Sequence, residues 1–352
     1  MNAQTEILIV GQGLAGTLVS YHLHKNQIKH LVIDTPHVGS ASKVAAGLIN
    51  PIGIKRMVKS WNVDLFLPYA HNLYSEMEEF LQTRFFYPVL MDKIYGEKDS
   101  SFWQHRMEAG ELQNYINLNN NLPELPTGIE APFGYGQIKQ GARLHIYDLL
   151  TAYRSFLIQS NMLIEANFKD EDLVLNPYEI RWNGINAKKI LFCRGEKDSQ
   201  SKLFEALNFR NTKGELLNIE IPDLELKNIL LKGIFIMPVG KNNFKIGATF
   251  EHEWKDLSPS KEKKEELINS WKKISKLPLS IKDQLTGIRP TMHDRRPVIG
   301  FLPHQPNIGI FNGLGSRGGL IAPLLAQQFV TSLSGSTDQL YKEVKVERYY
   351  RN

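Results

Sequence analysis

The sequence holds a single cysteine and no long apolar segment. Cys193 is the one cysteine among 352 residues, which excludes an internal disulfide and any cysteine-based metal cluster. It ends the apolar run 190–193, so we expect an inert thiol in a buried strand. No apolar run approaches the roughly 18 residues of a membrane-spanning helix, and no secretory leader precedes the first apolar run. We therefore expect a cytoplasmic protein with no membrane partner.

An excess of charge of one sign is also missing. The 42 basic and 37 acidic residues leave a net charge of +5, which most simply means a solvated, lysine-rich surface. The same mild positive charge also suits an anionic substrate, cofactor or nucleic acid. With 42% hydrophobic residues, the chain is long enough for two intertwined domains, or one large one, around an ample core. We predict no metal site.

The most informative segment is residues 7–34. An apolar run is followed at once by Gly11, Gly13 and Gly16, and a second apolar run ends in Asp34. This order predicts a strand, a tight turn, a helix and a second strand. Gly11 would permit the turn, Gly13 would let the backbone approach a pyrophosphate, and Gly16 would let the helix pack on the strand.

The helix predicted after this turn starts near Leu14 and Ala15. Its first N–H groups and its dipole would face phosphates, and Asp34 would accept hydrogen bonds from the adenosine ribose. We therefore predict a dinucleotide site, with an ordinary glycine turn as the alternative. The motif alone does not separate FAD from NAD.

A polar segment of small residues, 35–61, follows Asp34 and is too long to be an idle connection. Ser42, Ala45, Ala46 and Gly47 are small enough for a flat ring to lie against the backbone. The alternative is a solvated basic loop, because the segment also carries Lys43, Lys55, Arg56 and Lys59.

The rest of the chain predicts further elements. Apolar spacing predicts helices over 64–82 and 147–159, and residues 216–250 resemble a β-meander. We expect Ser258 and Pro259 to cap a charged helix. A strand at 308–311 leads to a second glycine-rich turn and a helix over 320–333. The two glycine turns would act on opposite ends of one cofactor, and the second turn would direct its N–H groups at that cofactor. The residues of the second turn are Gly313, Gly315, Ser316, Arg317, Gly318, Gly319 and Leu320.

With these motifs in place, the sequence resembles the FAD-dependent amino-acid and amine oxidases, the family of D-amino-acid oxidase, glycine oxidase and sarcosine oxidase. The resemblance covers nearly the whole chain, and its anchors are VGQGLAG, ASKVAAGLINP, GARLHIYDLL, KIGATF, GIRPTMHDRRPVIG and NGLGSRGGLIAPLLAQQF. The final motif is most similar to the oxidase half of the bifunctional enzymes that modify wobble uridine in tRNA.

The resemblance implies an α/β fold: a Rossmann-like FAD-binding domain of the GxGxxG type with an inserted antiparallel-sheet α+β substrate domain. The FAD-binding domain would be discontinuous, over residues 1–84, 141–200 and 286–352. The substrate domain would comprise residues 85–140 and 201–285. FAD rather than NAD is implied, and it would be noncovalent because Cys193 does not match the position of covalent attachment in sarcosine oxidase.

The resemblance also assigns roles to residues. Gly11, Gly13, Gly16 and Asp34 would hold the ADP half. Ser42, Ala46 and Gly47 would flank the isoalloxazine, Gly195 would approach the cofactor, and residues 313–320 would cap its pyrimidine side. Arg289 matches the G-x-R-P arginine, which binds the substrate carboxylate with two parallel bonds. Lys245 matches the lysine that promotes the reaction with oxygen in sarcosine oxidase.

Three of these basic residues have other readings. Arg289 could form a structural ion pair, Lys245 could lie at a sheet edge, and Arg317 could bind either substrate or the flavin phosphate region. The chain also departs from the family in two places. Phe235 and Met237 stand where several amino-acid oxidases carry a tyrosine, and RGEKD replaces the usual small-residue and tryptophan sequence after the strand at 190–193.

We therefore expect an FAD-dependent oxidoreductase that oxidises the C–N bond of a small amino acid or N-substituted glycine, with hydride transfer to flavin N5 and oxygen as the acceptor. Three alternatives stay open. The first is oxidative removal of a carboxymethyl group from modified wobble uridine, which would make tRNA a partner. The others are a flavin-dependent 2-hydroxy-acid dehydrogenase and a non-catalytic flavin-binding subunit. The sequence does not determine the oligomeric state.

Overall fold

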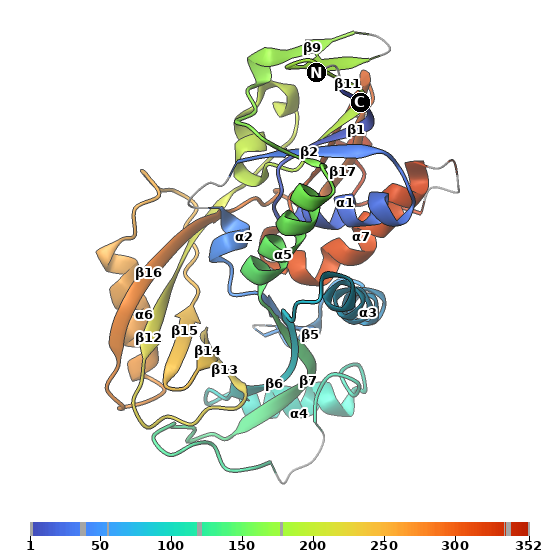
Figure 1. Cartoon of the computed structure of the whole chain (residues 1–352). Helices are drawn as coiled ribbons and strands as arrows, with labels where there is room; N and C mark the ends of the chain where they lie inside the picture. The colour runs from blue at the N-terminus through green and yellow to red at the C-terminus, as the bar shows by residue number, and fades with distance from the viewer. Residues whose placement is uncertain are drawn as a thin grey trace.

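A computed structural model of the chain describes residues 3–35, 40–54, 56–117, 122–176, 179–333, 335 and 339–350. Lys55 of the basic segment lies outside these residues, and the side chain of Lys43 is not described either. The described residues form two large sheets in separate halves of the molecule (Figure 1). None of the described helices is both long and apolar enough to cross a membrane.

The first sheet is built around the first strand of the chain. Strand β1 lies between β11 and β2, and the pairings of β18 with β11, β11 with β1, β1 with β2, and β2 with β8 are all parallel. In spatial order, the strands are β17 (Val298–Leu302), β18 (Gln305–Asn312), β11 (Ile185–Phe192), β1 (Ala3–Val10), β2 (His30–Asp34) and β8 (Leu163–Glu165). Strands β9 (Leu173–Leu175) and β10 (Ile180–Trp182) extend this sheet antiparallel beside β11.

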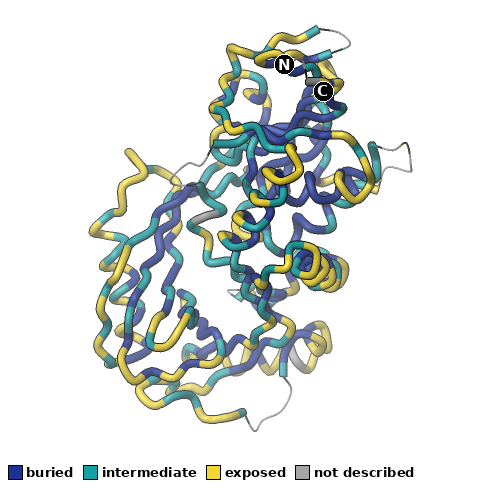
Figure 2. The backbone as a smooth tube through the Cα atoms, in the orientation of Figure 1, coloured by how far each residue is buried: buried dark blue, intermediate teal, exposed yellow. Residues whose placement is uncertain are grey.

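Helices cover the first sheet. α1 (Leu14–Lys25) packs on α7 (Gly318–Leu333), and α3 (Val63–Leu81) packs on α7 in turn. α5 (Ile146–Gln159) lies beside α1 and α3. The tube drawn by burial shows the strands of this sheet and much of α1 and α7 as buried (Figure 2), as expected for a parallel sheet that is covered by helices.

The turn between β1 and α1 depends on the absence of side chains at two glycines. Gly11 has φ +104°, and a Cβ there would lie 2.6 Å from the Cys193 carbonyl oxygen. A Cβ at Gly16 would clash with the Gly11 carbonyl oxygen. Gly11 and Gly16 therefore let α1 start directly at the end of β1.

The second sheet is mixed and strongly curved (Figure 1). Its strands in spatial order are β16 (Ser280–Arg289), β12 (Thr212–Glu220), β15 (Asn243–Gly247), β14 (Ile234–Gly240), β13 (Ile229–Lys232), β6 (Phe86–Ile94), β7 (Tyr135–Leu144) and β3 (Leu48–Ile49). Its own core contains the buried Trp271 of α6 (Lys261–Lys272), which packs on β12. α4 (Asp99–Glu108) follows β6, and a small two-stranded sheet of β4 (Ile52–Gly53) and β5 (Val58–Lys59) completes the fold with α2 (Ala41–Val44).

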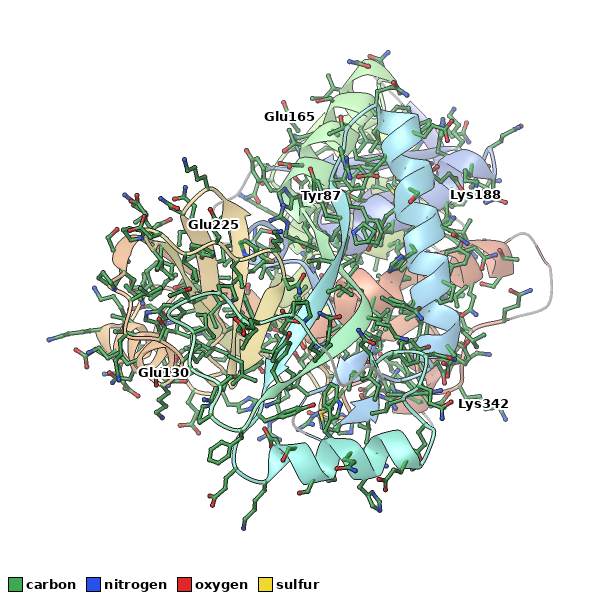
Figure 3. The ribbon with its side chains drawn as sticks, turned by 90° about the horizontal axis from the view of Figure 1, so that it is seen from below. Tyr87, Glu130, Glu165, Lys188, Glu225 and Lys342 are labelled. Carbon is green, nitrogen blue, oxygen red and sulfur yellow. The ribbon has the colours of Figure 1, made fainter. Side chains whose placement is uncertain are left out.

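The two halves of the molecule can also be distinguished in a second view. Viewed from below, Glu130 and Glu225 lie on the side of the second sheet, whereas Lys188 lies on the opposite side, and Tyr87 of β6 lies between them (Figure 3). The predicted division into domains follows the two sheets only in part. Its boundaries after residues 140 and 285 fall inside β7 and β16, which both belong to the second sheet, so the exact division stays a prediction.

The predicted helices 64–82, 147–159 and 320–333 are confirmed as α3, α5 and α7, with ends shifted by one or two residues. The predicted helix cap at Ser258 and Pro259 is wrong. The N-cap of α6 is Ser260, whose hydroxyl accepts a hydrogen bond from the backbone N–H of Lys263. Ser258 instead donates its backbone N–H to Asp256 at 2.7 Å, in a turn before the helix.

We predict that Ser260→Ala lowers the free energy of unfolding by about 1 kcal/mol, because the Lys263 N–H loses its acceptor. Chemical denaturation followed by circular dichroism measures the change. Ser270→Ala on the same helix is the control, since Ser270 only bonds back to the Glu266 carbonyl and its loss should not destabilise the helix. Equal stability of the wild type and Ser260→Ala would contradict the cap.

Candidate active site

A cavity of about 950 Å³ lies between the two sheets. Its wall begins at the carboxyl ends of β1, β2 and β11, passes α2 and the N-terminus of α7, and continues across β12, β15, β14 and β13. Ligands of open parallel sheets bind at the carboxyl ends of the strands. The cavity therefore lies where the topology of the first sheet predicts a site.

The inner end of the cavity is formed by the first glycine turn. Gly11, Gly13, Leu14 and Ala15 line it together with Asp34. Gly13 is the N-cap of α1 and brings no side chain to cap the helix, so the end of the helix stays open toward the cavity. A Cβ at Gly13 would approach only Ser42, at 3.3 Å from its Oγ. The one tight contact is with the end of a side chain, so little of the fold occupies the space in front of Gly13.

Asp34 is fixed by two donors. Its Oδ1 accepts the backbone N–H of Gln12 at 3.0 Å, and its Oδ2 accepts Nη1 of Arg154 at 2.9 Å. Arg154 also donates to Gln12 Oε1 and pairs with Glu165. The carboxylate side chain is only 10% exposed, so its position is well determined. Sequence reasoning missed Arg154, because it lies on α5, 120 residues after Asp34.

The middle of the cavity is lined by the small residues of the segment after Asp34. Ser42 Oγ accepts the backbone N–H of Leu14 at 3.2 Å, which ties α2 to the start of α1. Ala45, Ala46 and Gly47 follow α2 and line the cavity. Gly47 has φ +72°, and a Cβ there would clash with the Leu144 carbonyl oxygen. These residues bring little side-chain bulk to the cavity wall, and their role against a flat ring stays a prediction.

The second glycine turn lies beside the first, because a Cβ at Gly318 would be 3.3 Å from the Leu14 side chain. Gly315, Ser316, Arg317, Gly318, Gly319 and Leu320 line the cavity at the start of α7. Gly313 and Gly315 have φ +74° and +56°, and the Gly315 N–H donates to the Pro290 carbonyl at 2.9 Å. The side chain of Arg317 approaches Gly53. Burial lowers the pKa of Arg317, and the nearby Arg296 and Arg295 lower it further.

A buried polar network joins the ends of β11 and β18. Asp198, which is fully buried, accepts the Arg194 N–H at 3.0 Å, Arg194 Nε at 2.6 Å and Asn312 Nδ2 at 2.8 Å. Asn312 Nδ2 also donates to the Gly195 carbonyl at 2.8 Å. Burial raises the pKa of Asp198, and the Arg194 guanidinium opposes this. The RGEKD segment, which departs from the family pattern, thus fixes Gly195 against the second glycine turn.

Arg289 lies at the end of β16 and faces the cavity. Its Nη1 donates to the Thr249 carbonyl at 3.1 Å, and its guanidinium lies 4.4 Å from the centre of the Phe250 ring. A Cβ at Gly214 would clash with the guanidinium, so only glycine leaves room for it on β12. Burial lowers the pKa of Arg289 to about 10, which still leaves it charged at neutral pH. No carboxylate in the described part of the chain pairs with it.

Lys245 lies on β15, two residues before Gly247. Gly247 lines the cavity, whereas Lys245 is not part of the wall. Burial lowers the pKa of Lys245, and Arg143 lowers it further, while Asp148 opposes the shift. Lys245 thus lies two residues from the cavity wall along β15, and the role of Lys245 in the reaction with oxygen stays a prediction.

The cavity collects most of the residues that the sequence singled out. Gly16, Gly313 and Lys245 lie outside its wall. The predicted residues that do line it are Gly11, Gly13, Leu14, Ala15, Asp34, Ser42, Ala45, Ala46, Gly47, Gly195, Arg289, Gly315, Ser316, Arg317, Gly318, Gly319 and Leu320. Cys193 is buried, and burial raises the pKa of its thiol well above the ordinary value, which agrees with the inert thiol that we expected.

Comparison with known families decides the class. The model of the family DAO, described as FAD dependent oxidoreductase, matches residues 6–331. The chain belongs to this family. The enzyme is therefore an FAD-dependent oxidoreductase, as the sequence predicted.

Two curated relatives are similar to the flavoenzyme to different extents. It is 30% identical, over 178 residues, to the tRNA 5-methylaminomethyl-2-thiouridine biosynthesis bifunctional protein MnmC of Idiomarina loihiensis. That match covers 47% of the chain and 29% of the relative, so the chain spans less than a third of the bifunctional protein. The chain is also 20% identical, over 362 residues, to the uncharacterized oxidoreductase YurR of Bacillus subtilis. That match covers 95% of the chain and 96% of the relative.

Solved structures show the same fold. Iminodiacetate oxidase from Chelativorans sp. BNC1 superposes with a TM-score of 0.79 at 18% identity and covers 98% of both chains. Glycine oxidase from Geobacillus kaustophilus superposes with a TM-score of 0.77 at 17% identity, over 97% of this chain and 100% of that one. The fold of the flavoenzyme is thus that of amino-acid and amine oxidases.

The residues of the cavity fit FAD. The open end of α1 suits the pyrophosphate, the fixed carboxylate of Asp34 suits ribose hydroxyls, and the small residues Ala45, Ala46 and Gly47 leave space for a planar ring. FAD in this family would supply a two-electron acceptor. That it is held without a covalent bond stays a prediction, which release of the flavin on unfolding would test.

We predict that Gly13→Val gives a folded protein that does not retain FAD, because the side chain would occupy the space in front of α1 while meeting only Ser42. The flavin absorbance per chain of the purified variant measures this, and circular dichroism reports folding. Gly240→Ala is the control, since Gly240 ends β14, its Cβ would meet only Asn243 at 4.0 Å, and it is not part of the cavity wall. A yellow, stoichiometric Gly13→Val protein would refute the placement.

Proposed function

We propose that the enzyme oxidises the C–N bond of a small amino acid or N-substituted glycine, with oxygen as the electron acceptor. The observation that carries this proposal is the guanidinium of Arg289. It is a largely buried cation in the cavity wall, with a backbone carbonyl and an aromatic ring as its partners. A buried charge without a counter-ion is costly, and a substrate carboxylate would supply the missing charge.

Arg289 would bind and orient the substrate. Its Nη1 is held by Thr249, and its plane lies over Phe250, so one edge of the guanidinium stays available for two parallel bonds to a carboxylate. Such a pair fixes the direction of the carboxylate as well as its position. Positioning of this kind can supply much of the rate enhancement, and no protein acid or base is required.

Bound FAD would supply the hydride acceptor at its N5 atom. The chain holds the α-carbon by its carboxylate, and the apolar residues Leu216 and Phe235 of the same wall limit the access of water. The amine must be neutral for its lone pair to assist the loss of hydride. Water would then hydrolyse the resulting imine.

The names of the structural neighbours support this class of substrate. Iminodiacetate, glycine and L-proline, which appear in three of these names, share an amine nitrogen on the carbon next to a carboxylate. Another neighbour is an L-α-glycerophosphate oxidase, which keeps a hydroxy substrate as the alternative. An anaerobic screen of amines and hydroxy acids for bleaching of the flavin separates the two.

A second candidate function is oxidation of a substituted glycine carried by tRNA. The name of the partial relative from Idiomarina supports it, and so does the basic group at the cavity, where Arg295 and Arg296 lie near Arg317. Arg296 lies over the Trp61 ring at 4.5 Å. Cations near the entrance of an active site would suit a phosphate backbone.

For the first candidate, Arg289→Ala should retain FAD but raise the apparent KM for the carboxylate substrate, because both charge-assisted bonds are lost. The increase should correspond to a loss of about 2 to 4 kcal/mol of binding free energy. Steady-state kinetics with the best amino acid of the screen measures the change. Arg181→Ala removes an exposed arginine that pairs with Glu179 and should leave KM unchanged. Unaltered kinetics in Arg289→Ala would contradict binding of the substrate carboxylate by Arg289, which we call the clamp.

For the acceptor, Lys245→Met should slow reoxidation of the reduced enzyme by oxygen about tenfold, or about 1.4 kcal/mol of barrier, because a cation near the flavin is lost. Anaerobic reduction by substrate should keep its rate. Stopped-flow measurements of the two half-reactions separate these effects, and Lys232→Met, at the outer end of the wall, is the control. Equal reoxidation rates in wild type and Lys245→Met would exclude this role.

For the second candidate, tRNA should bind with an affinity that falls steeply with salt, and Arg295→Gln should weaken binding while Arg181→Gln does not. Fluorescence anisotropy of labelled tRNA at several salt concentrations measures both effects. Binding that is weak at low salt, or equal in the two variants, would contradict a tRNA substrate at this site.

A further inference from the structure

The cavity continues well beyond the space that a small amino acid needs. One row of paired residues crosses the second sheet: Leu216 pairs with Gly247, Gly247 with Phe235, Phe235 with Leu231, and Leu231 with Lys93. All five residues line the cavity. With adjacent strands about 4.8 Å apart, the four steps from β12 to β6 span about 19 Å. The wall is therefore a trough that runs across five strands.

Arg289 marks one end of this trough. Its guanidinium lies over Gly214, which is two residues before Leu216 on β12. A substrate whose carboxylate contacts Arg289 would occupy the β12 end. The opposite end, over β13 and β6, has no role in the proposed reaction.

That opposite end is aromatic. Tyr95, Phe102 and Trp103 line it, and the Tyr95 and Trp103 rings lie 5.5 Å apart. A Cβ at Gly136, which pairs with Lys93 on β7, would clash with the Tyr95 hydroxyl and the Trp103 ring. Glycine at this position lets both rings lie close to the strand. We call Tyr95, Phe102 and Trp103 the outer aromatic group.

Two hydrogen-bond donors in this group have no partner. Tyr95 and Trp103 are only 8% and 4% exposed, but Tyr95 Oη and Trp103 Nε1 are not among the fully buried, unpartnered polar atoms of the described residues, so both atoms face open space. Throughout the described ranges, no hydrogen bond involves Tyr95 Oη or Trp103 Nε1. This end also carries two lysines: Lys93 pairs with Asp99 at 2.7 Å, and Lys232 donates to the Lys273 carbonyl at 3.3 Å. The groups beside them are aromatic faces and neutral donors.

The outer end is also open. Phe102 is 42% exposed although it lines the cavity, and a Cβ at Gly233, in the β13–β14 turn, would meet no atom within 4 Å. A group bound there can extend past the edge of the protein. The trough thus suits an extended substrate better than a compact one.

We infer that the outer aromatic group is a subsite for a planar aromatic or heteroaromatic substituent of the substrate amine. The inference rests on the proposed clamp at Arg289, which sets the carboxylate at the other end. Ring faces would stack on Phe102, and acceptor atoms of a heteroaromatic ring would receive the free donors of Tyr95 and Trp103. The preferred substrate is then a secondary amine that carries a carboxymethyl group on one side and a planar ring on the other.

Anaerobic reduction of the purified holoenzyme tests this. The probes are sarcosine, N-benzylglycine and N-(pyridylmethyl)glycine, which share the carboxymethyl amine and differ in the ring. In the wild type, kcat/KM should rise from sarcosine to the two ring-bearing amines. Phe102→Ala should lower the ratio for N-benzylglycine over sarcosine about tenfold, and Phe133→Ala, which removes an exposed phenylalanine outside the cavity wall, should leave it unchanged.

A second variant tests the donors. Trp103→Phe keeps an aromatic ring and removes Nε1, so it should lower kcat/KM for N-(pyridylmethyl)glycine more than for N-benzylglycine. Equal ratios in wild type and Phe102→Ala, or no gain from a ring, would overturn the subsite while sarcosine still reduces the flavin. Altered FAD affinity or flavin absorbance in Phe102→Ala would also overturn it, because the outer end would then belong to the cofactor. If none of the three amines reduces the flavin, the proposed function itself fails.

Discussion

The site depends on one buried positive charge, at Arg289, that no carboxylate among the described residues neutralises. The pairing of β16 with β12 sets Arg289 over Gly214, and Thr249 and Phe250 hold the guanidinium without adding negative charge. Removing a cation from water is costly unless it is paired. The fold accepts this cost where an anionic ligand can remove it, which separates Arg289 from the paired Arg154 and Arg194.

The wall beside this charge is assembled from separate parts of the chain. Three strands end together at the carboxyl edge of the first sheet: β1 at Gly11, β11 at Gly195 and β18 at Gly313. Their turns are joined by contacts that are remote in sequence, since Asp198 and Asn312 are 114 residues apart. The result is a continuous surface in which the two glycine turns lie side by side at one edge of the sheet, with Gly318 against the Leu14 side chain.

The sequence predicted what local rules determine. Gly11, Gly13 and Asp34 follow from one strand–turn–helix pattern, and the resemblance to a family added Arg289. The sequence did not predict the contact of Arg154 with Asp34 or the buried polar network around Asp198, because these partners meet only in the folded chain. It also placed the cap of α6 two residues early, since Ser258 and Ser260 look alike until hydrogen bonds are known. The domain boundaries fell inside β7 and β16 because strands that run between both halves carry no signal of a change of domain.

The alternation of a strand explains why Lys245 and Arg289 differ. Side chains two residues apart lie on the same face of a strand, about 6.6 Å apart, so Lys245, two residues before Gly247, shares its face but lies one row away from the cavity wall. The row of Lys245 contains Asn218 and Met237, and neither lines the cavity. A cation in this row would act on the site through its field rather than by contact, and Arg143 and Asp148 act on Lys245 in turn. If the proposed roles hold, binding of substrate and reaction with oxygen belong to different rows of one sheet.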